Sequence, residues 1–310
     1  MRVVFMGTPQ FAVPALDALV QSDYEVVGVF AQPDEPAGRG RSVVIPPVKD
    51  LALQHRIMVH QPRTLRGCCE MERLAGLRPD VVVIAAYGKI LPEPMLRVPP
   101  RGCLNIHASL LPRHRGPSPI AKAILDGDEA TGVTIMVVTE VMDTGPILAQ
   151  RQVPILAHDT TGSLSQKLSG LGAELLMDTL PKWLDGRLSP QPQDGGKATY
   201  SRMIRKEEGR VDWGRSAVEL WRRVRAFQPW PGCFTTWQGR TVKVLEAVPL
   251  PGEGTPGVVV TTNDERAAVG VRTGDGVLGL VQVQLEGKRP TGGAEFARGQ
   301  RGFVGSRLPG

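Results

Sequence analysis

Residues 1–150 alternate short runs of β-branched and apolar residues with longer amphipathic stretches. The apolar runs predict buried strands at residues 2–6, 25–31, 80–86, 103–107 and 131–138. The amphipathic stretches predict helices at residues 11–21, 47–55 and 117–127. Strands that alternate with helices form parallel sheets covered on both faces, so the pattern predicts a doubly wound, mostly parallel α/β sheet. Ligands bind such sheets at the carboxyl ends of the strands, and we expect the functional site there.

A change of composition after residue 186 indicates a second domain. The periodic stretch at residues 161–186 predicts one long helix that begins at Thr160 or Thr161 and ends at Gly186. The residues that follow are rich in Pro, Gly and polar side chains, as in an interdomain linker. A helix at residues 216–227 and four short β runs then predict a small β-barrel or sandwich. We therefore expect a first domain at residues 1–187, a linker at 188–204 and a second domain at 205–310.

The composition is typical of a soluble globular protein, with 41% hydrophobic and 22% charged residues. No apolar stretch approaches the ~18 residues of a membrane span, and the amino terminus enters a predicted strand without a signal-peptide pattern. The four cysteines show no C-x-x-C spacing, which argues against a disulfide framework and against a structural zinc site. We expect a cytoplasmic protein.

Positive charge is concentrated in two parts of the chain. Residues 1–204 hold 21 Lys and Arg against 20 Asp and Glu, whereas residues 205–310 hold 16 against 11. An irregular loop is predicted at residues 32–49, and it carries Arg39 and Arg41 next to glycines. Such segments attract polyanions such as nucleic acid, although a merely solvated surface is the alternative on charge alone.

Common nucleotide-binding motifs are missing from the sequence. The turn after the first predicted strand reads MGTPQF and lacks the G-x-G-x-x-G that lets the backbone approach a pyrophosphate. The chain also has no Walker lysine loop. A doubly wound sheet alone therefore says nothing about function here.

Polar side chains end the strand predicted at residues 103–107. Asn105, His107 and Ser109 stand at alternate positions, so a strand through them would present all three on one face. An amide NH2 can donate to an oxyanion, an imidazole can transfer a proton near neutral pH, and a hydroxyl can position a substrate. The grouping is typical of an acyl-transfer site without a nucleophilic residue, although a structural histidine at a strand end is an alternative.

A second polar group follows the strand predicted at residues 131–138. The loop there carries Glu140 and Asp143 beside a glycine. At the edge of a neighbouring strand, Asp143 would reach His107, orient its ring and raise its basicity. A loop carboxylate is ordinary on its own, but with His107 it forms a candidate pair.

Three blocks of sequence resemble the 10-formyltetrahydrofolate-dependent formyltransferases: AAYGKILP, NIHASLLPRHRGPSPI, and TGVTIM followed by VMDTGPIL. The opening FMGTPQFAVPALDAL, the loop QPDEPAGRGR and the later stretch RAFQPWPG resemble the methionyl-tRNA formyltransferase branch of that family. The resemblance covers nearly the whole chain. It implies a Rossmann-like formyltransferase domain followed by an OB-like β-barrel with a basic surface.

The resemblance also implies roles for individual residues. It implies Asn105, His107 and Asp143 as the catalytic residues. The residues implied to contact the folate are Ser109, Leu110, Leu111, Pro112, Tyr87 and Gly88. Those implied to contact tRNA are Arg39 and Arg41. The expected substrates are 10-formyltetrahydrofolate as donor and methionyl initiator tRNA as acceptor, with no metal, no membrane partner and a monomeric protein.

Two rival functions are compatible with parts of the sequence. The first is the same chemistry on another acceptor, such as an amino sugar nucleotide, but the basic final third argues against it. The second is a tRNA-binding module without catalysis, but the presence of Asn105, His107 and Asp143 argues against that.

Several residues depart from the family pattern or have two interpretations. His114, Pro117 and Ser118 stand where a large aromatic and small residues are expected, so the lining beside the site is expected to differ. Asp34 and Glu35 add negative charge to the basic loop. Three tryptophans either pack in the core or stack on nucleotides: Trp221, Trp230 and Trp237.

Overall fold

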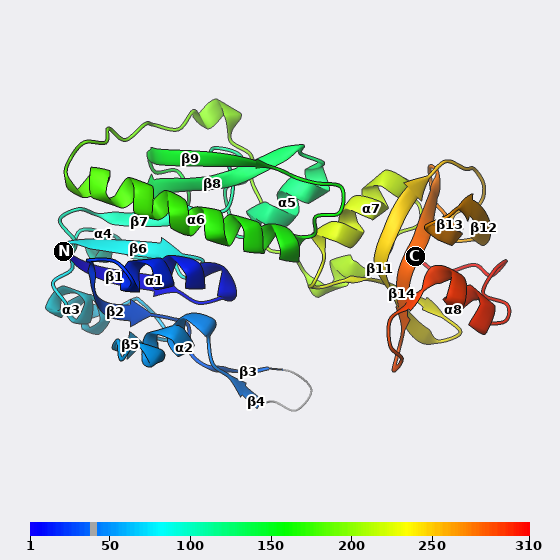
Figure 1. Ribbon diagram of the computed structural model, residues 1–310, viewed down its shortest axis with the longest axis horizontal. Coiled ribbons are helices and arrows are strands. Elements are labelled where there is room, and N and C mark those ends of the chain that lie inside the picture. The colour runs from blue at the N-terminus through cyan, green and yellow to red at the C-terminus, as the bar shows by residue number, and fades with distance from the viewer. Residues whose placement is uncertain (38–41) are drawn as a thin grey trace. The chain divides into compact units, whose positions relative to one another are not determined.

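The computed structural model describes residues 1–37 and 42–310, which form two compact units (Figure 1). The first unit consists of residues 1–119, 130–154 and 165–202. The second consists of residues 120–129, 155–164 and 203–310. The second unit thus includes two short segments from the first two-thirds of the chain, so no single cut of the chain separates the units.

A seven-stranded sheet forms the centre of the first unit, in the order β5-β2-β1-β6-β7-β8-β9. Its strands are β1 (Arg2–Gly7), β2 (Glu25–Phe30), β5 (Val59–His60), β6 (Val81–Ala85), β7 (Cys103–His107), β8 (Ala130–Val137) and β9 (Ile147–Pro154). The strands from β5 to β7 pair in parallel. β8 and β9 run antiparallel to their neighbours. The predicted mostly parallel sheet is confirmed, with β8 as an antiparallel addition and β9 as a strand that was not predicted.

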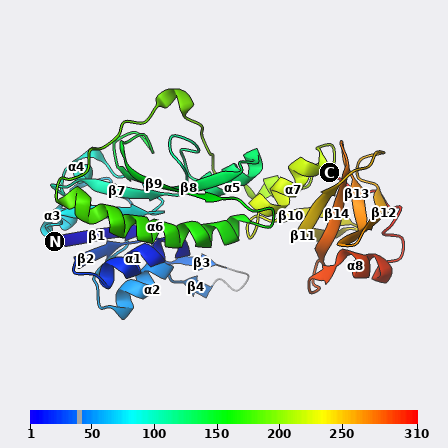
Figure 2. The ribbon, with the colours of Figure 1, turned by 45° about the horizontal axis from the view of Figure 1, so that its top comes forward.

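Helices lie beside this sheet (Figure 2), and some of them form where the sequence predicts helices. They are η1 (Gln10–Ala12), α1 (Val13–Val20), α2 (Pro47–Gln54), α3 (Cys68–Gly76), α4 (Glu93–Leu96) and α6 (Thr161–Leu184), of which α3 and α4 were not predicted. The predicted helix α5 (Pro119–Asp126) belongs, from residue 120 on, to the second unit. The long predicted helix is confirmed: the Ser163 amide donates to the Thr160 hydroxyl at 3.2 Å at its start. Gly186, with a φ of 71°, follows its end.

The packing of α6 decides which face of the sheet is open for a site. A Cβ added to Gly172 of α6 would lie 2.8 Å from Cγ2 of Ile106 and 3.5 Å from Val133, so the helix backbone lies directly on β7 and β8. The Ser169 hydroxyl also donates to the Phe11 carbonyl at 2.7 Å. Because side chains alternate along a strand, the neighbours of Ile106 in β7 point to the opposite face.

The predicted irregular loop at residues 32–49 contains two short strands. β3 (Glu35–Ala37) and β4 (Ser42–Val44) pair antiparallel, with Glu35 opposite Val44. The prediction of an irregular segment is therefore wrong for these residues. The predicted tRNA contacts, Arg39 and Arg41, lie outside the described residues.

The second unit holds an antiparallel sheet in the order β10-β11-β14-β13-β12, with β15 beside β14. Its strands are β10 (Cys233–Trp237), β11 (Arg240–Leu250), β12 (Val259–Asp264), β13 (Ala267–Arg272), β14 (Val277–Leu285) and β15 (Thr291–Gly292). Its helices are α7 (Ala217–Ala226) and α8 (Gly293–Gly299), and short 3-10 turns lie at η2 (Gly195–Lys197), in the first unit, and η3 (Lys206–Gly209), in the second. The predicted fold class, an α/β domain followed by a small β domain, is confirmed.

Aromatic packing in the second unit bears on the three tryptophans for which the sequence allowed either core packing or stacking on nucleotides. Trp237 is buried, and its ring meets those of Phe296 and Phe303 edge to face, with centroids 6.3 and 5.4 Å apart. The Arg225 guanidinium lies over the Trp221 ring at 4.4 Å. Trp230 is 56% exposed. Core packing therefore holds for Trp237 and not for Trp230.

Candidate active site

β7 carries two of the predicted site residues on the face that α6 leaves open. Asn105 lies opposite Ile84 of β6 and Met136 of β8, close to the carboxyl end of the strand. His107 is the last residue of β7 and lies opposite Thr134. The two side chains are two positions apart in one strand, so they point to the same face, as the sequence predicts.

The amide of Asn105 is available to a ligand. Its residue is half-buried, and within residues 1–37 and 42–310 its side chain has no hydrogen-bond partner. A primary amide offers two N–H donors, and buried amides are normally satisfied. A partly buried donor without a partner, beside a histidine, is suited to binding a substrate oxygen.

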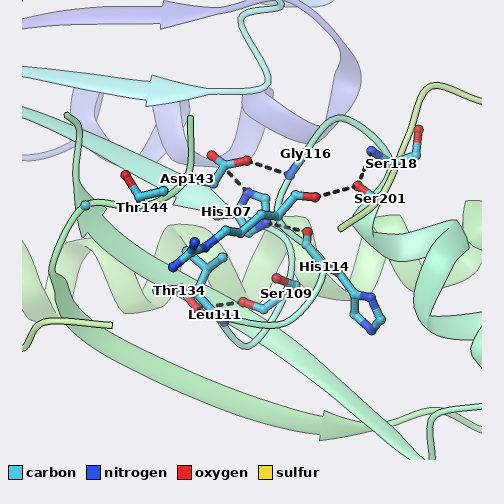
Figure 3. Close-up of polar contacts among 12 residues, drawn as sticks. His107, Ser109, Leu111, His114, Gly116, Ser118, Thr134, Asp143, Thr144 and Ser201 are labelled. Carbon is cyan, nitrogen blue, oxygen red and sulfur yellow. Dashed lines mark hydrogen bonds and ion pairs between the residues drawn. The ribbon is translucent and has the colours of Figure 1, made fainter. Parts of the chain in front are cut away.

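The ring of His107 is buried between two hydrogen-bond acceptors (Figure 3). Its Nε2 lies 3.1 Å from the carbonyl oxygen of His114. A carbonyl oxygen only accepts, so Nε2 carries the proton, and in the neutral ring Nδ1 is the basic nitrogen. Nδ1 faces Oδ1 of Asp143 at 3.6 Å. A proton that arrives on Nδ1 is therefore stabilised at once by a carboxylate.

Burial sets the charge state of this histidine. Only 6% of its side chain is exposed, and this desolvation lowers the pKa of His107 below the ordinary histidine value. The Asp143 carboxylate and the His114 carbonyl raise the pKa and partly oppose the effect. The resting imidazole is neutral near neutral pH, which is the form that accepts a proton.

Asp143 reaches His107 from the loop after β8. Its Oδ2 accepts a 2.8 Å hydrogen bond from the Gly116 amide, which leaves Oδ1 directed at the ring. The residue has a φ of 54°, a left-handed conformation that Asp tolerates better than most side chains. Two residues on, a Cβ at Gly145 would lie 1.8 Å from the Val137 carbonyl oxygen, so this loop can pass so close to β8 only with glycine there. The structure thus brings Asn105, His107 and Asp143 to one place, and their catalytic roles stay predictions.

The strand does not continue to Ser109, contrary to the alternation argument. β7 ends at His107, and the Ser109 hydroxyl donates to the Arg113 carbonyl at 2.6 Å. Ser109 is fully buried, and its own carbonyl accepts from the Thr134 hydroxyl at 2.6 Å. Thr134 also accepts from the Leu111 amide, so it links the two ends of the Ser109–Leu111 turn. The Ser109 hydroxyl therefore closes a turn instead of facing the site beside His107.

The other predicted folate contacts differ in how much of each residue is accessible. Leu110 and Pro112 are half-buried, whereas Leu111 is buried. Tyr87 lies in the apolar core around β6, only 2% exposed, and its hydroxyl has no partner among the residues that the structure describes. That burial raises the pKa of the Tyr87 hydroxyl. Gly88 follows with a φ of 81°, which favours glycine.

Charges near the base of the basic loop are already paired. The Asp34 carboxylate accepts from the Gln61 amide at 2.7 Å and from the Lys49 ammonium at 2.6 Å. These contacts lower the pKa of Asp34. Of the two acidic residues that the sequence adds to this loop, Asp34 is therefore balanced by Lys49.

Sequence reasoning missed the residues that hold the site from outside β7 and β8. The His114 ring is buried and points away from the His107 ring, so His114 contributes its carbonyl (Figure 3). Gln193, in the predicted linker, donates to the Asp143 carbonyl at 2.9 Å. Gly116 contributes its backbone amide, which donates to Oδ2 of Asp143. His114 and Gly116 lie in the block that carries the family resemblance, but neither they nor Gln193 show a periodicity from which these contacts could be predicted.

Within the described part of the chain, no group of three or more His, Cys, Asp or Glu side chains is arranged to hold a metal ion. No helix in the same residues is both long and apolar enough to cross a membrane.

Comparison with known proteins identifies relatives of this chain. Residues 1–180 match the family described as Formyl transferase, and residues 203–301 match the one described as Formyl transferase, C-terminal domain. A methionyl-tRNA formyltransferase from Roseiflexus sp. (strain RS-1) is 47% identical over 312 residues, which cover 99% of this chain and 95% of the relative.

Solved structures share the fold at low identity. An N-formyltransferase from Helicobacter canadensis, in complex with folinic acid and dTDP-3-aminofucose, has a TM-score of 0.67 at 16% identity and covers 93% of this chain and 99% of its own. HypX from Aquifex aeolicus, in complex with tetrahydrofolic acid, has a TM-score of 0.62 at 19% identity and covers 99% of this chain and 48% of its own.

Proposed function

The chain belongs to the methionyl-tRNA formyltransferase family, and on that premise we propose that it transfers the formyl group of 10-formyltetrahydrofolate to the α-amino group of methionyl initiator tRNA. The observation that carries this proposal at the site is the buried His107, whose basic Nδ1 faces Asp143. Asn105, two residues before His107 on the same strand face, has an amide without a partner in the described part of the chain. The family membership indicates the substrates, and the geometry supports His107 as the base and Asn105 as the oxyanion donor.

The reaction forms one C–N bond and breaks another. The neutral α-amine attacks the formyl carbon, and the carbonyl oxygen becomes an oxyanion in the tetrahedral intermediate. The bond from that carbon to N10 of the folate then breaks, the attacking nitrogen loses a proton, and N10 gains one. The products are N-formylmethionyl-tRNA and tetrahydrofolate. A free α-amine has a pKa of about 7.7–8.0, so a substantial neutral fraction already exists near neutral pH.

His107 takes the proton from the attacking nitrogen in this proposal. Its Nε2–H is engaged with the His114 carbonyl, so Nδ1 is the accepting atom. The imidazolium that results lies between that carbonyl and the Asp143 carboxylate, both of which favour the charged ring. The same group then returns the proton to N10 as the intermediate collapses. Positioned acids and bases contribute about 10²–10⁴-fold in such reactions.

Asn105 donates to the oxyanion in this proposal. Its amide is half-buried and unpaired in the described residues, so no existing bond has to break when the substrate binds. A single donor of this kind contributes about 2.7–4 kcal/mol to transition-state stabilisation.

The donor is a folate derivative, and we propose that residues 109–112, Tyr87 and Gly88 lie along its site. Leu110 and Pro112 offer accessible apolar surface. The side chains of Ser109 and Tyr87 are buried, so contacts from these two residues are expected through the backbone.

For the tRNA, we propose contacts from Arg39 and Arg41 in the basic loop and from the positively charged residues 205–310. Phosphate contacts by Arg and Lys dominate the affinity of proteins for nucleic acids. The proposed division is a catalytic domain at residues 1–187 and a tRNA-binding domain at residues 205–310, joined along the chain by residues 188–204, in a monomer that acts in the cytoplasm.

An acceptor competition tests this function. The protein is incubated with 10-formyltetrahydrofolate and, in parallel reactions, with methionyl initiator tRNA, methionyl elongator tRNA and an amino sugar nucleotide. We expect formylation of the initiator tRNA at a kcat/KM far above that of the other two. Preferred turnover of the amino sugar nucleotide would contradict the proposal.

A further inference from the structure

Gln193 uses its whole amide to join two parts of the site. Its Nε2 donates to the carbonyl oxygens of Asp143 at 2.9 Å and Gly145 at 2.7 Å. Its Oε1 accepts from Nε and Nη2 of Arg115, at 3.1 and 2.8 Å. All four hydrogen-bonding positions of the side chain are therefore occupied. Residues 191, 192 and 194 are exposed, so Gln193 is the residue at which this segment turns inward.

The two carbonyls that Gln193 binds belong to a strained loop. Asp143 has a φ of 54°, and non-glycine residues hold such a conformation only where their surroundings fix it. A Cβ added to Gly145 would lie 1.8 Å from the Val137 carbonyl oxygen, so the backbone at Gly145 already packs against β8. The loop at residues 143–145 is therefore held between Gln193, which binds two of its carbonyls, and β8, against which Gly145 packs.

Arg115 ties the same segment to the loop after β7. Its amide donates to the Thr199 carbonyl at 2.9 Å, and its carbonyl accepts from the Ser201 amide at 2.7 Å. Its side chain is buried, which makes the two hydrogen bonds to Gln193 costly to lose. The next residue, Gly116, donates to Oδ2 of Asp143. Asp143 is thus held at its carboxylate by Gly116 and at its carbonyl by Gln193.

We propose that Gln193 is a positioning residue that sets the distance between the Asp143 carboxylate and Nδ1 of His107. Residues 191–201 then contribute to catalysis through the Gln193 side chain, and the two hydrogen bonds from Arg115 hold that side chain in place. This inference rests on the proposed role of Asp143 in catalysis. It assigns a function to a side chain in a segment that the sequence predicts to be only a linker.

A double-mutant cycle in the full-length protein tests the proposal. We expect Gln193→Ala to lower kcat for formyl transfer by about 10- to 100-fold, because a displacement of about 1 Å at a reacting group has effects of this size. In an Asp143→Asn background the same change is expected to cost less than about twofold, since no charge remains to be positioned. The kcat–pH profile of Gln193→Ala should shift to lower pH, in the same direction as that of Asp143→Asn.

Gln191→Ala is the matched control. Gln191 is a glutamine of the same segment, but within residues 1–37 and 42–310 its side chain donates only to the nearby Ser189 carbonyl. We expect its kcat to stay within about twofold of the wild type. Gln193→Met keeps the volume of the side chain and replaces Gln193→Ala if the latter lowers the melting temperature. Gln193→Glu keeps an acceptor for Arg115 and loses the donors, so we expect it to stay impaired.

The outcomes separate this inference from the proposed function. If Asp143→Asn is impaired while Gln193→Ala and Gln193→Met behave like Gln191→Ala, the positioning role of Gln193 is overturned and the role of Asp143 stands. Losses that multiply in the double variant would also overturn it, since they would indicate a general structural effect. If Asp143→Asn keeps wild-type activity, the catalytic role of Asp143 and the positioning role of Gln193 both fail, while formyl transfer as the function stands.

Discussion

Replacing Asp143 by Asn removes the charge that faces His107 and changes little else. Nδ1 and Oδ1 are 3.6 Å apart, and both side chains are largely buried. At an effective dielectric constant of ~20, two unit charges at this separation attract by about 4 to 5 kcal/mol. An Asn side chain still offers an oxygen to the Gly116 amide, so the loop is expected to keep its conformation.

The size of the rate effect depends on how far the proton has moved in the transition state. A change of about 1.4 kcal/mol in the barrier is a factor of ten in rate. If the proton has fully reached His107, the loss of the charge lowers kcat by about 10³-fold, and if it is halfway, by about 50-fold. We therefore expect Asp143→Asn to fall between these values.

Single-turnover formylation at saturating donor and acceptor measures the effect without a contribution from product release. Glu140→Gln is the matched control, because Glu140 is an exposed carboxylate of the same loop. We expect this control to stay within about twofold of the wild type. An Asp143→Asn variant that folds normally and reacts within about threefold of the wild type would refute the assignment of Asp143 as the partner of His107.

Three further predictions concern the same site, and a fourth concerns the basic loop. Asn105→Ala is expected to lower kcat by about 10²–10³-fold through loss of an oxyanion donor, and a folded variant with near-normal turnover would contradict this. Burial lowers the pKa of His107 below the ordinary value of ~6.5. The acidic limb of the kcat–pH profile, where His107 gains a proton, should therefore lie below pH ~6.5. An acidic limb above that pH would show that the resting ring is charged. Gly116→Ala should lower the melting temperature and the activity together, since a Cβ there would lie 2.4 Å from the Ser201 carbonyl oxygen; unchanged values of both would argue against the observed path of this loop. Arg39→Ala should raise the KM for tRNA and leave the affinity for the folate unchanged, and a selective loss of folate affinity would contradict the proposed role of the basic loop.

The sequence predicted the features that depend on periodicity. Strand alternation placed Asn105 and His107 on one face, and the structure confirms it, because both lie within β7. The apolar run at residues 80–86 corresponds to β6, whose residues are all buried, as expected of a strand covered on both faces. The Ser216 and Glu219 capping box explains why the helix predicted from residue 216 begins where it does.

Other features depend on contacts between distant segments and left no periodic pattern. The alternation argument failed at Ser109 because the Thr134 hydroxyl, on β8, binds the Ser109 carbonyl and the Leu111 amide and so closes a turn. The antiparallel direction of β8 was also missed, since a buried strand has the same pattern in either direction. Gln193 was hidden in a Pro- and Gly-rich stretch, where composition predicts irregular backbone and says nothing about which side chain turns inward.

The most direct test of the proposed reaction follows the formyl group itself. A 13C-formyl label on 10-formyltetrahydrofolate is given to the protein with stoichiometric methionyl initiator tRNA, and the aminoacyl group is released by mild base and analysed by mass spectrometry. The account predicts that the label appears on the α-nitrogen of methionine and that its appearance is slowed in the His107→Ala variant. Unlabelled methionine after incubation with the folded wild-type protein would contradict the central claim.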